Sequence, residues 1–138
     1  MFRRFLFLAA ALICTATVGA SQGCPAKKGE EFPGIEALNQ LLLNADFQGF
    51  SAAVADGSGG GILLDMTAIS QVFPTGFSQC TTIAQRFEPQ GTMQSIVVFR
   101  SDIGPLFAYW LVLPTSTGFT LNSISLDTNV SAILNLLK

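Results

Sequence analysis

Few side chains in this sequence are suited to chemistry. None of the 138 residues is histidine, which excludes Ser-His and Cys-His nucleophilic catalysis and the usual imidazole zinc sites. The remaining candidates for proton transfer are the single tyrosine, Tyr109, and three aspartates, Asp65, Asp102 and Asp127. These aspartates fall at a predicted helix start, in a turn and at a strand end, which are ordinary capping or solvated positions. We therefore assign no catalytic residue.

The glycine-rich segment 56–61 has the composition of a phosphate-binding or calcium-binding loop. A phosphate loop needs a following Lys and a Ser or Thr, but Ile62 and Leu63 follow here. An EF-hand needs a glutamate at its twelfth position, where this chain has Thr67. The segment is therefore predicted to be a flexible surface connection, and the sequence predicts neither a metal nor a cofactor.

The first 20 residues have the layout of a secretory signal peptide. Arg3 and Arg4 precede an apolar stretch that ends at Ile13, and small residues lead to Ala20, after which cleavage is expected. A membrane anchor is the competing interpretation, but the apolar stretch is shorter than the about 20 residues that span a bilayer. We expect residues 21–138 to form one periplasmic or secreted domain, without a transmembrane segment in the mature chain.

Cleavage would remove Cys14 and leave two cysteines, Cys24 and Cys80, in an oxidising compartment. Two is the number that one disulfide needs. The alternative is a lipoprotein processed at Cys24, for which Gly23 fits but Ser21 stands where Leu or Val is usual. A lipid on Cys24 would leave Cys80 without a partner, so the two hypotheses exclude each other. Without a Cys-x-x-Cys pair, a redox function has no support.

Helical periodicity dominates the first half of the mature chain. Pro33 suits a first helical position, and Gly49 marks the expected end of this helix. Its apolar stripe recurs every three or four residues: Ile35, Leu38, Leu42 and Ala45. Residues 48–55 are compatible with one buried helical turn or two. A second helix is predicted between the glycines and Pro74, because its apolar residues repeat at four, three and four: Ile62, Met66, Ile69 and Phe73.

From Cys80 onward, runs of β-branched and aromatic residues alternate with short turn signals, which is typical of a strand meander. The predicted strands cover residues 81–88, 93–100, 106–113 and 119–126. Because the loops between them are short, neighbouring strands should pair antiparallel. A last short helix with apolar residues at 130, 133, 134 and 137 is expected to pack back on the sheet.

The third predicted strand, residues 106–113, is apolar on both faces. Such a strand must be covered on both sides. Helices would cover one face, and the second cover would be strong curling of the sheet, a second subunit in a homodimer, or a small apolar ligand. Four aromatic residues are the candidates for lining a ligand pocket, the alternative being that they are simply core: Phe99, Phe107, Tyr109 and Trp110.

The segment from Phe99 to Asp127 carries the most specific features. A strand ends at Phe99-Arg100, its turn carries Gly104-Pro105-Leu106-Phe107, and the last strand begins Gly118-Phe119-Thr120-Leu121. These features, with the order of elements elsewhere, resemble the cystatin-like and NTF2-like superfamily, in particular its small exported bacterial proteins of unknown function.

The resemblance implies an α+β fold in which helices pack on a curled four-stranded antiparallel meander sheet. It also implies a pocket at the open end of the resulting cone and a tendency to dimerise through the outer sheet face. In isomerase-type members of the superfamily an Asp base and a Tyr line the cone.

Composition narrows the function classes further. Without Arg3 and Arg4, five Lys and Arg face nine Asp and Glu, a formal net charge of −4, and no basic stripe is available for nucleic acid. We therefore predict an exported, non-enzymatic binding or assembly module that buries an apolar ligand or a partner subunit. The alternative is a pocket enzyme of the isomerase or hydratase type that uses an Asp and Tyr109.

Overall fold

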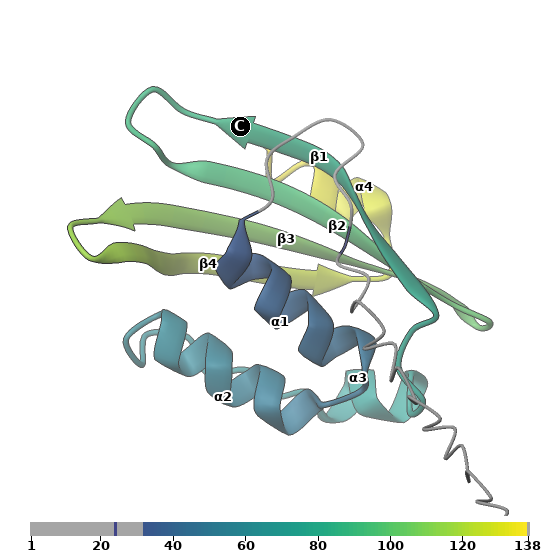
Figure 1. Cartoon of the computed structure of the whole chain (residues 1–138). Coiled ribbons are helices and arrows are strands. Elements are labelled where there is room, and N and C mark those ends of the chain that lie inside the picture. The colour runs from purple at the N-terminus through teal and green to yellow at the C-terminus, as the bar shows by residue number, and fades with distance from the viewer. Residues whose placement is uncertain (1–23, 25–31, 138) are drawn as a thin grey trace, which may run out of the picture.

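Four consecutive strands form an antiparallel sheet in a computed structural model that describes Cys24 and residues 32–137 (Figure 1). The strands lie in chain order: β1 (Gln79–Phe87), β2 (Met93–Ser101), β3 (Gly104–Thr115) and β4 (Gly118–Asp127). Their ends differ from the predicted ends by at most two residues. The register shifts between Thr82 and Ala84 and between Leu111 and Val112, and irregularities of this kind bend and twist a sheet. The predicted α+β fold with a curled, open meander sheet is confirmed.

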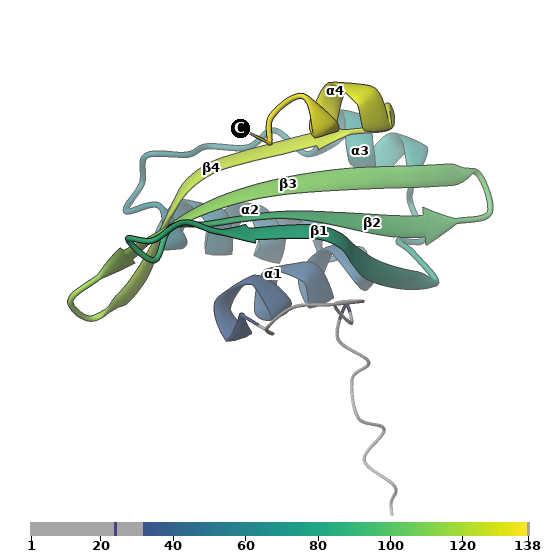
Figure 2. The same ribbon diagram turned by 90° about the horizontal axis from the view of Figure 1, so that it is seen from above.

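The helices lie on both sides of this sheet. The first two, α1 (Pro33–Leu43) and α2 (Phe47–Gly57), cover one face, and the short α3 (Thr67–Val72) follows them in the chain. The last helix, α4 (Val130–Leu134), lies across the sheet from α1 (Figure 2). We call the face under α1 and α2 the helix face and the face under α4 the outer face.

Gly49 does not end the first helix, contrary to the sequence prediction. The helix α1 ends at Leu43, and Ala45 then adopts a left-handed backbone with φ 59°. Asp46 caps α2, because its Oδ1 accepts a hydrogen bond of 2.9 Å from the backbone N–H of Gly49. The glycine therefore lies in the first turn of a new helix, and the capping aspartate three residues earlier was the better signal.

The predicted second helix is wrong in its first half, because residues 61–66 are not helical. Ser51 of α2 donates a hydrogen bond of 2.8 Å to the carbonyl of Leu64, which holds this stretch against α2 instead. Ile62 and Leu64 pack against the core, while Leu63 between them is 83% exposed. Spacings of three and four between apolar residues therefore did not distinguish a helix from a non-helical segment packed on the core.

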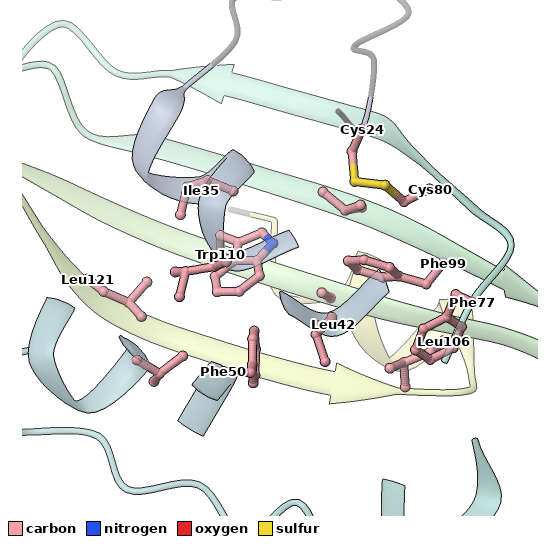
Figure 3. Close-up of a cluster of buried hydrophobic side chains, with 14 of the residues drawn as sticks. Cys24, Ile35, Leu42, Phe50, Phe77, Cys80, Phe99, Leu106, Trp110 and Leu121 are labelled. Atoms are coloured by element: carbon pink, nitrogen blue, oxygen red, sulfur yellow. A yellow bond between two sulfur atoms is a disulfide. The ribbon is translucent and has the colours of Figure 1, made fainter. Parts of the chain in front are cut away.

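The main core fills the space between the helix face and α1 and α2 (Figure 3). Its largest fully buried side chains come from both layers and include Leu42, Phe50, Val54, Phe99 and Trp110. Trp110 stands edge to face against Phe50, with ring centroids 5.9 Å apart. A second, smaller cluster lies on the outer face, where Ile133 of α4 packs with Ile96 and Tyr109.

The strand β3 is thus covered on both faces within one chain. Of the covers considered from sequence, neither a second subunit nor a ligand is needed to bury it. The C-terminal helix α4, which the sequence predicts to pack on the sheet, lies on the outer face. Leu136 and Leu137, which follow α4 in the chain, pack against the same cluster. The two-sided apolar pattern of β3 is explained by this double cover.

Cys24 and Cys80 form the predicted disulfide, with their Cα atoms 4.8 Å apart. The backbone of Cys24 is held as well: its N–H donates to Glu36 Oε2 at 2.8 Å, and its carbonyl accepts from Thr82 Oγ1 at 3.3 Å. Cys24 is 1% exposed. The disulfide uses the thiol that the lipoprotein alternative would need. The expected signal peptide, residues 1–20, lies outside the described residues.

Replacing both Cys24 and Cys80 by serine should lower the free energy of unfolding by about 4 kcal/mol, because the bond closes a long loop in the unfolded chain. The sequence separation is 56 residues. Urea denaturation of the oxidised wild type and the double variant measures the difference. The control Thr82→Val removes only the hydrogen bond to Cys24 and should cost about 1 kcal/mol. Equal urea midpoints for wild type and double variant would show that the disulfide does not stabilise the fold.

Candidate functional site

The four aromatic residues proposed to line a pocket do not face one cavity. Phe99 and Trp110 point to the helix face and are fully buried, as Figure 3 shows. Phe107 and Tyr109 lie on β3 at positions that face the other way, in the cluster under α4. Since successive strand residues point to opposite faces, the sheet itself separates the two pairs.

On the helix face the aromatic side chains are packed as core. Phe99 lies 5.4 Å from Phe77, measured between ring centroids. Within the described part of the chain, two polar atoms of this core have no hydrogen-bond partner: Trp110 Nε1 and Asn39 Oδ1. The amide nitrogen of Asn39 donates a hydrogen bond to Glu36 Oε1 at 3.4 Å.

The outer face combines an apolar cluster with one polar pair. The hydroxyl of Tyr109 donates to Gln94 Oε1 at 3.2 Å, and both residues are buried. Tyr109 lies opposite Ile96 on β2 and Ser125 on β4. Burial raises the pKa of the Tyr109 phenol above its usual value of 10, because the phenolate would lose its hydration there.

None of the three candidate aspartates is the partner of the Tyr109 hydroxyl. Asp127 lies opposite Phe107 and accepts a hydrogen bond of 2.7 Å from the backbone of Asn129. Asp102 belongs to the turn between β2 and β3. Asp65 accepts a hydrogen bond of 2.9 Å from the N–H of Thr67, and hydrogen bonds from Thr67 lower the pKa of this carboxyl. Asp127 lies on the same face of the sheet as Tyr109, two residues along β4 from Ser125, but the Tyr109 hydroxyl donates to Gln94 and not to this carboxylate.

A polar hollow of about 220 Å³, which the sequence analysis did not predict, lies at one end of the sheet. It is lined by residues 75–78 and by Ser101 and Asp102. The two serine hydroxyls of the hollow donate hydrogen bonds to backbone carbonyls. Ser78 donates to the carbonyl of Arg100 at 3.1 Å, and Ser101 donates to the carbonyl of Gly104 at 2.9 Å. The turn signals Pro74-Thr75-Gly76 and Ser101-Asp102 were visible in the sequence, but only folding places them side by side.

Among the residues that the structure describes, no three His, Cys, Asp or Glu side chains gather as a metal site would require. The helices in this part of the chain also lack the length and apolar character needed to cross a bilayer. Comparisons with protein-family models, with curated proteins and with solved structures found no match. The resemblance to the cystatin-like and NTF2-like superfamily therefore stays a prediction.

Gly76 positions the hollow against the end of α1, and an alanine there should be destabilising. Its backbone has φ 75°, and an added Cβ would lie 2.6 Å from the carbonyl oxygen of Leu43. The control Gly60→Ala has φ 81° and no atom near its added Cβ. We expect Gly60→Ala to cost about 1 kcal/mol from backbone conformation, and Gly76→Ala about 3 kcal/mol because the contact adds to it. Urea denaturation gives both values, and equal losses would contradict the close contact.

Titration of Tyr109 should report its burial, because it is the only tyrosine of the chain. Its raised pKa means that the unfolded chain loses the phenol proton at a lower pH than the folded chain. The free energy of unfolding should therefore fall as the pH rises above the usual value of 10. Near-ultraviolet absorbance of the phenolate measures the titration, and Tyr109→Phe should remove this part of the pH dependence. A phenol that titrates at its usual pH in the folded protein would contradict the burial.

Proposed function

We propose that this chain is an exported, disulfide-bonded module that binds an apolar partner and has no catalytic role. The Cys24–Cys80 bond supports an oxidising compartment, where such bonds persist. The bond between the Tyr109 hydroxyl and the Gln94 amide supports a structural role for the one tyrosine, because a general acid or base would need a titratable partner or a substrate there.

The observation that carries this proposal is the nature of the cover on the outer face. The helix α4 has five residues, far fewer than the about 12 that an isolated helix needs to be stable in water. Its fully buried contact is Ile133, whereas the adjacent Leu134 is 46% exposed. When α4 moves away, the apolar side chains of Ile96, Phe107 and Leu111 become available. A five-residue helix held by Ile133, with only partly buried Leu136 and Leu137 after it, is a cover that an apolar ligand can displace.

A partner subunit is the other apolar occupant of this face, and it would require the same displacement of α4. The ligand is preferred here because the outer-face cluster is small and contains a buried polar pair, which suits a molecule with one polar group. The isomerase or hydratase alternative is not favoured by any contact of Tyr109.

Binding of the fluorescent apolar probe N-phenyl-1-naphthylamine tests the proposal. Wild type should bind it at one saturable site, and Ile133→Asp should bind about tenfold more tightly, because the cost of displacing α4 has been removed. Leu134→Asp is the matched control, since it adds the same charge at the neighbouring exposed position, and it should behave as wild type.

Trp110 fluorescence monitors the helix-face core in every variant, because Trp110 is the only tryptophan. Light scattering under the same conditions separates ligand binding from dimer formation. Absence of saturable probe binding in both wild type and Ile133→Asp would refute the ligand proposal, and a dimer that forms only in Ile133→Asp would favour the partner subunit.

A further inference from the structure

Positive charge in the described part of the chain is confined to the outer face of the sheet. The Lys and Arg residues among 32–137 are Arg86 and Arg100. Arg86 pairs across the strands with Gln94, and Arg100 belongs to the same alternate set of β2 as Gln94 and Ile96, which face α4. The outer face also carries the carboxylate of Asp127, but this residue lies opposite Phe107, four residues along β3 from the row of Arg86. The helices α1 and α2 contain Glu36 and Asp56 and no Lys or Arg.

Arg86 lies beside the polar pair of the outer-face cluster. The register places Arg86, Gln94 and Leu111 in one row across β1, β2 and β3. Tyr109 reaches Gln94 from the neighbouring row. The cationic side chain, the amide and the hydroxyl therefore form a polar strip along one side of the apolar cluster under α4.

The Arg86 side chain can exchange its present ion pair for another. Its Nε lies 2.9 Å from Glu88 Oε1, and the two side chains are 55% and 33% exposed. Exposed ion pairs of this kind contribute little to stability. A ligand with an anionic head group and an apolar chain can therefore compete with Glu88 for Arg86. Burial of the apolar chain adds to the binding free energy of the ligand, whereas Glu88 has no such contribution.

We propose that the outer face binds a single-chain anionic amphiphile of the fatty-acid class, an inference that rests on the proposed function. Its head group pairs with Arg86 beside Gln94, and its alkyl chain replaces Ile133 of α4 along Ile96 and Phe107. The distance along the strands from the row of Gln94 to the row of Phe107 is about 13 Å, from the rise per strand residue, which a dodecanoyl chain spans.

Three probes with the same alkyl chain and different head groups test this charge preference: dodecanoate, dodecanol and dodecyltrimethylammonium. Each competes with N-phenyl-1-naphthylamine for wild type, Arg86→Gln and Arg100→Gln, at concentrations below micelle formation. Wild type should bind dodecanoate at least tenfold more tightly than either other probe, because only dodecanoate pairs with Arg86. The Arg86→Gln variant should lose this preference. The Arg100→Gln variant, with the same change on the same face, should keep it.

The outcomes separate this inference from the proposed function. Equal affinities for dodecanoate and dodecanol in wild type would overturn the anionic preference while leaving apolar binding intact. Loss of the preference in Arg100→Gln but not in Arg86→Gln would overturn the assignment of Arg86. If no probe, including N-phenyl-1-naphthylamine, binds wild type or Ile133→Asp, both proposals fail. Because the readout is a ratio of affinities within each variant, a uniform loss of folded protein does not imitate the expected result.

Discussion

The burial of two adjacent residues on opposite faces of β3 is the constraint on which the architecture depends. Trp110 enters the main core against Phe50, and Tyr109 enters the small cluster under α4. A central strand of this kind cannot leave either face to water without exposing a large aromatic side chain. The sheet is therefore the middle of three layers, with α1 and α2 on one side and a much thinner layer on the other.

The two outer layers are held in different ways. On the helix side Cys24 is held by the disulfide to Cys80 and by hydrogen bonds with Glu36 and Thr82. On the outer side α4 follows β4 after a short connection, in which Asp127 accepts a hydrogen bond from the N–H of Asn129 and Asn129 accepts one from the N–H of Ser131. The helix side thus has a disulfide and a hydrogen bond from Cys24 to Glu36 of α1, while the outer side is covered by the five-residue α4 with Ile133 beneath it. Because of this difference, we place the proposed displacement of α4 by a ligand on the outer face.

The sequence was informative where local signals and tertiary contacts agree. The positions of the strands were predicted well, because β-branched and aromatic runs between turn residues leave little choice of where each strand begins and ends. The helical half was predicted less well. The prediction that Gly49 ends a helix is wrong, because Asp46 caps a new helix there. The prediction of a helix through Ile62 is wrong, because residues 61–66 are not helical and Ser51 of α2 donates a hydrogen bond to the carbonyl of Leu64. Glycine and apolar spacing are ambiguous signals, since caps and neighbouring elements decide between their outcomes.

The sequence alone determined the strand meander and the absence of histidine chemistry, because each depends on residue types and short-range spacing. It left the disulfide and the lipoprotein alternatives for Cys24 open, and the structure shows the disulfide. Only the tertiary structure decided which aromatic side chains share a face, what covers β3 and where the two arginines lie. Alternation along a strand shows that neighbours point apart, but the side on which each helix packs depends on contacts between distant segments. The four aromatic residues that the sequence groups as candidates for lining a pocket are therefore divided by the sheet between its two faces.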